Sequence, residues 1–408
     1  MNTLIIVALS LFMPFLGFCL SNYLFQYKNI NYKACIFSIS LFMASLSYSY
    51  IPLTETDLTR YFQIIENTKY AGFLDTINFN TYNHFIPYTF NFLVWICNVI
   101  ENSHFLPFFS TFLVYYISLY LTFSYTDNNV SYKKLVAYYI VIMLCYNWQA
   151  LANNIRNITA FLIIGCAVFR ELELKKKNIW TYILYVIAVF LHPTAIVLII
   201  LRIGLVIRNK IKFALVGLII FAQYFVAYAY NVLYNYISFA PLKQAIFLAN
   251  KYFSDTNSSW GLVVQNSIVQ RAIRLLSFIL AGLFILLYFR NNKIKTKFCD
   301  SYMQQFGFYL ALLTLACAPI LTPAYWRFSY CSIAVNSCTF VDNFNSEKRD
   351  SVDNTAIHAV FIIAIGLFAL NTWSIRRDII QILKSFAFLY NIPFFEIIKG
   401  IFTAIKNI

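Results

Sequence analysis

Apolar runs of about 20 residues recur along the whole chain and are separated by short polar breaks. A helix takes roughly 20 apolar residues to cross the hydrocarbon core of a bilayer, so each run predicts a transmembrane helix. The composition agrees, since 61% of the residues are hydrophobic and only 12% are charged. We therefore expect an all-α polytopic integral membrane protein, with one transmembrane domain over residues 1–408, about 12–14 transmembrane helices and no separate soluble module.

Three segments depart from the simple pattern of spans. Residues 86–100, IPYTFNFLVWICNVI, are too short to span and predict a re-entrant or amphipathic helix within an outer loop over 53–105. A second outer loop is expected over 234–269, and the tail over 374–408 predicts an interfacial helix or a last, imperfect span. The N-terminal run lacks the features of a cleaved signal peptide and predicts the first span. The expected spans are 3–24, 34–52, 106–125, 135–152, 154–170, 179–193, 194–207, 213–233, 270–289, 303–321, 324–341 and 356–373.

The distribution of Lys and Arg predicts the orientation, because basic loops stay on the cytoplasmic side. The loops RELELKKK and RNNKIKTK fall on one side of the expected spans, and basic residues are fewer on the other. We therefore expect these two loops in the cytoplasm and the start of the span that holds Arg156 on the outer face. The net charge of +15 follows from this topology and predicts no nucleic-acid partner.

The cysteines and histidines predict neither a metal site nor another cofactor. The nine cysteines lie mostly inside apolar runs without a C-x-x-C pair, as expected for small buried side chains. There are four histidines and no H-E-x-x-H pattern. Of these, His84, His104 and His358 are interpreted as surface or packing residues.

Four arginines on the predicted outer side are the most specific polar feature. Arg156 opens a span in NNIRNITAFLIIGCAVF, Arg271 and Arg274 open another in QRAIRLLSF, and Arg327 follows a turn in LTPAYWRFSYC. A single arginine at a helix end can simply extend to the lipid headgroups. Four together on this side favour a binding site, because a charge at the membrane is costly and guanidinium groups fit phosphate. The expected ligand is an anionic, lipid-linked substrate.

Other polar residues of the outer side each have two interpretations. His192, in VFLHPTAI, either donates to a backbone carbonyl at the proline kink or acts as a neutral general base on a sugar hydroxyl. Asp57, in TETDLTRYF, is either a turn residue or the partner of Arg60. Tyr252 and Trp260 either stack on sugar faces or reflect the high aromatic content of 19%.

These motifs follow one another in a recognisable order. An arginine opens a helix, a lysine-rich loop and an apolar helix follow, and the next turn reads VFLHPTAI; upstream, a D-x-x-x-Y element is present as Asp57 to Tyr61, followed by a short amphipathic segment. In this order the chain resembles the EpsG-like and O-antigen polymerase (Wzy) families of bacterial polysaccharide assembly. These families commonly have Glu-Pro where this chain has Ile86 and Pro87, and Gln where it has Asn157.

The resemblance implies a GT-C-like, metal-independent glycosyltransferase of the bacterial inner membrane. Such a polymerase joins undecaprenyl-diphosphate-linked oligosaccharide repeat units into O-antigen, capsular or exopolysaccharide chains at the outer face. Its expected partners are these lipid-linked glycans, the bilayer and a chain-length regulator protein. With the resemblance, Arg156, Arg327 and His192 are expected to be catalytic, the last as base, and Asp57, Tyr61, Arg271 and Arg274 to bind substrate. Arg60, beside Asp57, and Tyr252 and Trp260 of the second outer loop are further expected substrate-binding residues.

Three other functions remain open. An O-antigen ligase or another lipid-linked sugar transferase would use the same arginines and the same histidine. A flippase or transporter of lipid-linked oligosaccharides would also carry arginines in the membrane, but we find no internal repeat with paired broken helices. A membrane scaffold without chemistry is the last alternative. The order of the motifs favours the polymerase.

Overall fold

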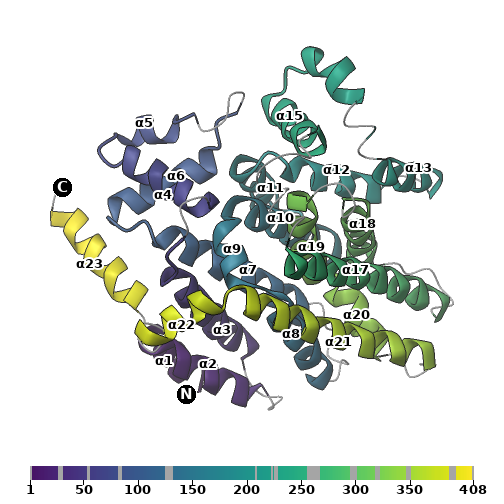
Figure 1. Ribbon diagram of the computed structural model, residues 1–408, viewed down its shortest axis with the longest axis horizontal. Helices are drawn as coiled ribbons and strands as arrows, with labels where there is room; N and C mark the ends of the chain where they lie inside the picture. Colours follow the sequence, from purple (N-terminus) through teal and green to yellow (C-terminus); the bar gives the residue numbers. More distant parts are fainter. Residues whose placement is uncertain are drawn as a thin grey trace.

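A computed structural model of the chain describes residues 2–25, 31–52, 56–80, 85–124, 132–206, 209–221, 224, 228–254, 267–294, 301–317, 322–345, 351–385 and 392–406. These residues form helices joined by turns, which confirms the expected all-α architecture (Figure 1). The N-terminal half contains α1 (Asn2–Phe12), α2 (Pro14–Leu24), α3 (Tyr32–Tyr48), α4 (Asp57–Asn67), α5 (Phe73–Ile77), α6 (Tyr88–Val99), α7 (Phe105–Ser124), α8 (Tyr132–Cys145), α9 (Trp148–Asn153), α10 (Ile155–Val168), the π-helical turn η1 (Phe169–Glu173), α11 (Ile179–Leu191) and α12 (Ala195–Leu205). The C-terminal half contains α13 (Asn209–Ile220), η2 (Ala229–Leu233), η3 (Tyr234–Tyr236), α15 (Ala240–Ser254), α17 (Ile268–Ile294), α18 (Tyr302–Cys317), α19 (Thr322–Val335), α20 (Ser337–Asn345), α21 (Ser351–Ser374), α22 (Arg376–Ser385) and α23 (Ile392–Lys406).

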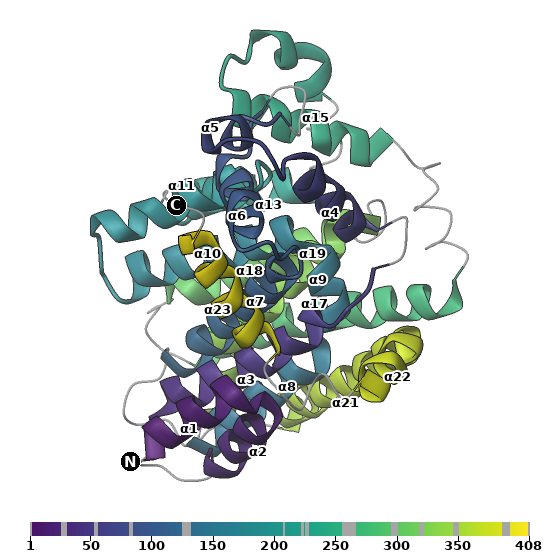
Figure 2. The same ribbon diagram turned by 90° about the vertical axis from the view of Figure 1, so that its left-hand side faces the viewer.

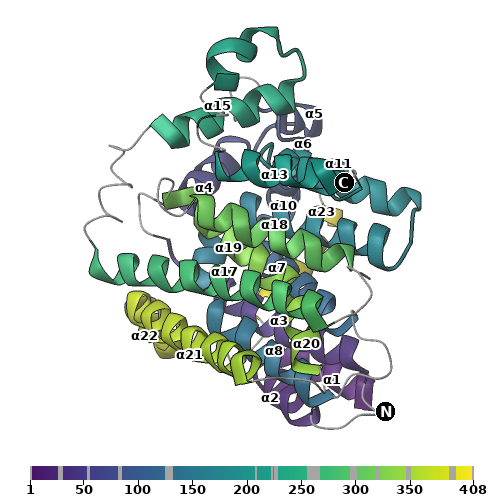
Figure 3. The ribbon, with the colours of Figure 1, turned by 90° about the vertical axis from the view of Figure 1, so that its right-hand side faces the viewer.

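Three helices of the described residues are long and apolar enough to cross a membrane. They are α7, the part of α17 over Ile268–Asn291, and α21 over its whole length. Further apolar helices are shorter, among them α3, α11 and α12. The helices and the apolar character together indicate a membrane protein, and the expected number of 12–14 crossings stays a prediction. In Figure 3, α17 and α21 run side by side, in agreement with their extensive contacts.

The single span expected over 3–24 is wrong, because this segment forms two helices. Pro14 cannot continue a helix from the preceding turn, and α1 ends at Phe12 just before it. The helices α1 and α2 then pack on each other. Gly17 allows this approach, since a Cβ atom at this position would collide with Ser10.

The span expected over 324–341 is also divided. It forms α19 and α20 with a break at Asn336, whose Nδ2 donates to the carbonyl oxygens of Ser332 and Gly307, at 2.9 and 3.1 Å. Gly307, on α18, leaves the room that the Asn336 side chain occupies. The tail beyond 374 forms two helices rather than one, α22 and α23.

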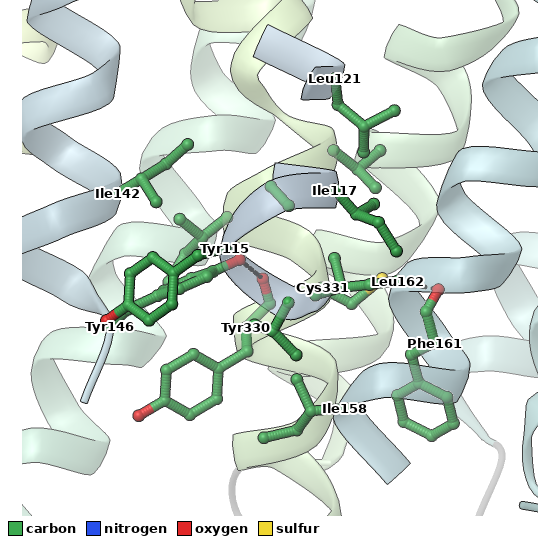
Figure 4. Packing of buried hydrophobic residues seen from close by; sticks show 14 of the residues in the cluster. Tyr115, Ile117, Leu121, Ile142, Tyr146, Ile158, Phe161, Leu162, Tyr330 and Cys331 are labelled. Carbon is green, nitrogen blue, oxygen red and sulfur yellow. Dashed lines mark hydrogen bonds between the residues drawn. The ribbon is translucent and has the colours of Figure 1, made fainter. Parts of the chain in front are cut away.

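Helix α10 lies at the centre of the bundle, and every residue in it except Cys166 is buried. It contacts α7, α9, α11, α12 and α19. Figure 4 shows part of the core around it, where the Cys331 thiol of α19 donates to the carbonyl oxygen of Phe161 and the Tyr146 hydroxyl donates to that of Tyr330. The rings of Phe161 and Phe328 stack with centres 5.1 Å apart. The position of α19 against α10 is therefore fixed by both packing and hydrogen bonds.

The expected outer loop over 53–105 contains a compact cap made of α4, α5 and α6, which Figure 2 shows beside the ends of α10 and α11. Two asparagines of α6 hold it together: Asn91 Nδ2 donates to the carbonyl oxygens of Ile77 and Phe79, and Asn98 Nδ2 donates to that of Thr68. Helix α6 has 12 residues, fewer than a membrane crossing takes. Its re-entrant or amphipathic character stays a prediction.

At the other end of α10, an ion pair joins three helical segments. Glu171 lies on η1 and is buried, and it accepts hydrogen bonds from the guanidinium of Arg202 on α12 and from the hydroxyl of Tyr185 on α11. The pairing is bidentate, with Nε of Arg202 2.9 Å from Oε2 of Glu171. It ties α11 and α12 to the end of α10.

Helix α22 contacts the segment that precedes α10. The Asp378 carboxylate accepts a hydrogen bond of 2.6 Å from Nε2 of Gln149 on α9, and the same Nε2 lies 3.1 Å from the hydroxyl of Tyr50. The final helix, α23, packs against α3, α6 and α7. The C-terminal helices therefore lie against the N-terminal half of the chain.

Candidate functional site

Arg156 lies in the first turn of α10 and is buried, with 7% of its surface exposed. Its guanidinium carbon is 4.6 Å from the ring centre of Phe90 on α6 and 5.0 Å from that of Tyr61 on α4. The two rings are 5.1 Å apart and tilted, so both face the same cation. Contacts of this kind partly offset the cost of burying a charge. The cap thus fixes where the guanidinium of Arg156 lies.

Arg327 lies in the second turn of α19 and is also buried, at 8% exposure. Its Nε donates to Oδ1 of Asn154 over 3.4 Å. Asn154 is the residue at which α9 ends and α10 begins. This contact brings Arg327 to the same end of α10 as Arg156, although 171 positions separate the two arginines in the sequence.

His192 lies in the turn between α11 and α12, outside both helices. Pro193 follows it and favours an extended backbone at His192, where φ is −151° and ψ is 124°. Nδ1 of the imidazole lies 2.6 Å from Oγ1 of Thr194 and accepts the backbone N–H of Thr194 over 3.3 Å. One interpretation of the sequence was that His192 donates to a backbone carbonyl freed at the proline kink. Both contacts of Nδ1 are instead with Thr194.

The electrostatics join these residues into one cluster. Burial lowers the pKa of His192 well below its ordinary value, and the charges of Arg156 and Arg327 lower it further. Burial raises the pKa of Tyr61, the nearby charges of Arg156 and Arg327 oppose that rise, and the charge of Asp57 adds to it. Arg156, Arg327, His192 and Tyr61 therefore act on one another at one end of the bundle. The imidazole of this cluster is neutral at pH 7.

Asp57 is the partner of Arg60, which agrees with one of the two interpretations drawn from the sequence. Nη1 of Arg60 lies 3.4 Å from Oδ1 of Asp57, and both side chains are partly exposed on α4. The pair borders the cluster through Tyr61, which follows Arg60 on the same helix. Asp57 therefore contributes to the rim of the site and not to its buried centre.

The remaining expected site residues lie on α17 or fall outside the described side chains. Arg271 and Arg274 lie in the first turns of α17, exposed and half-buried respectively, and neither acts on the pKa of Tyr61 or His192. Tyr252 belongs to α15, but its side chain is outside the described residues, as is the whole of Trp260. A role in binding for these four residues stays a prediction.

Three residues of the cluster were not singled out from the sequence. Phe90 stacks on Arg156, Asn154 binds Arg327, and Thr194 orients His192. Asn154 and Thr194 lie within two residues of a predicted site residue, so proximity in sequence was a usable signal for them. Phe90 gave no such signal, because it is one of 42 phenylalanines and reaches the site through the fold of the cap.

Among the described residues, no group of three His, Cys, Asp or Glu side chains comes together that could hold a metal ion. The polar groups that do come together are two guanidiniums, an imidazole and a phenol. Guanidinium groups are donors only and are always charged. The cluster is therefore suited to a ligand that carries negative charge and several acceptor oxygens, such as a phosphate or diphosphate.

A family model, that of the EpsG family, matches residues 53–391. The chain belongs to the EpsG family. Searches of curated proteins and of solved structures find no match. The family match includes every residue of the cluster, from Asp57 to Arg327, and membership in the EpsG family indicates a polysaccharide polymerase-like, glycosyltransferase-like function.

The segments outside the EpsG match also have a consistent place in the fold. Helices α1, α2 and α3 precede it, and α23 follows it. Their ends meet, because the ring centre of Phe12 lies 5.7 Å from that of Phe394. The parts that flank the EpsG match thus pack on each other.

Proposed function

We propose that this EpsG-family protein is a polymerase that joins undecaprenyl-diphosphate-linked oligosaccharide repeat units into O-antigen, capsular or exopolysaccharide chains. The observation that carries the proposal is the convergence of Arg156 and Arg327 on the buried imidazole of His192. Two buried guanidiniums at one point match the charge of a diphosphate, which is the shared feature of donor and leaving group in this reaction.

The helix ends add to the attraction of an anion. Helices α10 and α12 both begin at the cluster, and α19 begins about one turn before Arg327. The N-terminus of a helix carries partial positive charge from its backbone N–H groups. Three such ends with two arginines favour a diphosphate over a neutral sugar at this position.

The proposed reaction is a displacement at the anomeric carbon of the growing chain. A hydroxyl oxygen of the incoming repeat unit forms the new glycosidic bond while the bond from the anomeric carbon to the diphosphate oxygen breaks. The electron pair of that bond stays on the lipid diphosphate, whose growing charge Arg156 and Arg327 stabilise. The rim of the site, with Asp57 and Arg60, positions the acceptor.

The arginines take the role that a metal ion has in other phosphate-dependent transferases, so the proposed mechanism is metal-independent and GT-C-like. The expected location is the bacterial inner membrane with the cluster at its outer face, since the Lys-rich segment after η1 lies at the opposite end of α10. Substrate would therefore reach Arg156 from the outer side.

The proposal is tested by deleting the gene and separating the surface polysaccharide by size on a gel. Complementation with wild type is expected to restore long chains, whereas Arg156→Ala and Arg327→Ala are expected to leave single repeat units on the lipid anchor. Loss of a ligase would instead leave no unit on the lipid anchor, and loss of a flippase would trap the units inside the cell. Full-length chains from both variants at normal protein levels would contradict the assigned site.

A further inference from the structure

The hydrogen bonds between His192 and Thr194 indicate which nitrogen of the imidazole carries its proton. The backbone N–H of Thr194 is at the start of α12, where N–H groups have no carbonyl partner within their own helix. It donates to Nδ1 of His192, at 3.3 Å. A backbone N–H can only donate, so Nδ1 is an acceptor and bears no proton.

A neutral imidazole has one N–H, and the other nitrogen must carry it when Nδ1 does not. The Thr194 hydroxyl, 2.6 Å from Nδ1, is then a second donor to the same nitrogen. Pro193 stabilises this arrangement, because it holds His192 extended and brings the ring back over residue 194. The orientation and the tautomer of the ring are both determined by residues of its own turn.

We propose that His192 serves the polymerase reaction as a hydrogen-bond donor through Nε2–H, and not as the base that removes the acceptor proton. The inference rests on the proposed function for its substrate, whereas the tautomer itself does not. The protonated Nε2 has no lone pair with which to take a proton. The acceptor of this hydrogen bond is a phosphate oxygen of the lipid diphosphate, which Arg156 and Arg327 also bind.

If His192 is not the base, the proton of the acceptor hydroxyl must go to another group. The acceptor hydroxyl gives its proton to an oxygen of the departing diphosphate, which gains basicity as the bond to the anomeric carbon breaks. His192 ends the reaction with the same proton on Nε2 that it had at the start. Burial and the charges of Arg156 and Arg327 keep the ring neutral. A neutral ring is consistent with this role, because a hydrogen-bond donor does not have to become charged during the reaction.

The tautomer is testable by ¹⁵N NMR of histidine-labelled protein in lipid nanodiscs at neutral pH. The chain has four histidines, and the spectrum of His192→Gln identifies the signals of His192. His104 is an internal reference, since its Nδ1 lies 2.8 Å from the carbonyl oxygen of Tyr48 and must donate. We expect a protonated Nε2 at His192 and a protonated Nδ1 at His104. A protonated Nδ1 at His192 would overturn the inference.

The role is tested separately in the deletion strain. A glutamine side chain donates through Nε2 but does not act as a base near pH 7. We expect His192→Gln to produce at least about tenfold more long-chain polysaccharide than His192→Ala, the worth of one hydrogen bond to a charged group. Equal loss in the two variants, at equal protein levels, would contradict the donor role.

Thr194→Val is the matched control for the turn, because it removes the hydroxyl and keeps the backbone N–H. We expect it to leave Nε2 protonated in the spectrum; a proton on Nδ1 would show that the hydroxyl and not the backbone decides the tautomer. A deletion strain that still makes long chains would contradict the polymerase proposal alone, since the NMR measurement does not depend on substrate.

Discussion

Phe90 lies directly against Arg156, with its ring centre 4.6 Å from the guanidinium carbon, although the two residues belong to different parts of the fold. Phe90 is fully buried on α6 of the cap, and Arg156 opens the central helix α10. The position of a charged group in the proposed site is therefore set by a residue that has no reactive group of its own.

Replacing Phe90 by Ala is expected to lower polymer production about tenfold or more, because the guanidinium loses a contact worth up to about 2 kcal/mol when desolvated. Phe90→Tyr keeps the ring and is expected to retain most of the activity. The readout is the amount of long-chain polysaccharide relative to protein. Phe92→Ala is the control, since Phe92 lies on the same helix and is 44% exposed; an equal loss there would mean that damage to α6, and not the contact with Arg156, is the cause.

Arg156→Lys is expected to lose nearly as much polymer as Arg156→Ala. Lysine keeps the charge but has no planar group to pack against Tyr61 and Phe90 or to bind two phosphate oxygens at once. Arg376→Lys is the matched control, because Arg376 also stacks on a ring, that of Trp373 at 4.5 Å, but is exposed on α22. Chain-length gels and protein levels give the comparison. Full activity of Arg156→Lys would show that charge alone is sufficient at this position.

The ion pair at the other end of α10 is expected to matter for stability and not for chemistry. Arg202→Met leaves the buried carboxylate of Glu171 without its guanidinium, a change that costs about 3–5 kcal/mol for a buried pair. The melting temperature in detergent should fall, and the combined variant Glu171→Gln/Arg202→Met should recover part of the loss. Glu66→Gln, which breaks the exposed pair with Lys69, serves as control and is expected to change little.

The pH dependence of stability should reveal the buried imidazole of His192. The pKa of His192 in the folded protein lies below the ordinary value of about 6.5, so between the two values the unfolded chain binds a proton that the folded chain does not. The free energy of unfolding therefore falls as the pH falls through this range, by up to about 1.4 kcal/mol per pH unit. Melting temperatures at pH 7.5 and 5.5 should differ less in His192→Gln than in wild type.

His104 contributes in the same direction, because burial lowers its pKa as well, so the wild-type dependence is not expected to vanish in His192→Gln. His358→Gln, at an exposed position of α21, controls for the loss of one imidazole. An unchanged pH dependence in His192→Gln would mean that the ring titrates as it does in the unfolded chain.

The sequence predicted the helical architecture, and it singled out Arg156, Arg327 and His192, which the structure brings into one cluster. The arginines stand out because charge at the start of an apolar run is costly, and the same argument selects Arg271 and Arg274, whose role stays a prediction. His192 stands out because it precedes a proline between two apolar runs. The breaks in the expected spans were harder to predict. Pro14 marks the end of α1 in the sequence, but the break at Asn336 depends on space provided by Gly307 on another helix. Phe90 could not be predicted at all, since only tertiary packing brings α6 to α10.

The contact between Asp378 and Gln149 has a consequence for biosynthesis. Its two ends are 229 residues apart, and the carboxylate belongs to a helix made near the end of translation. While the chain is still being inserted, α9 lacks this support, whereas the residues of the cap that contact Arg156 have already been made. The helix that directly precedes Arg156 thus gains this support only once α22 has been made.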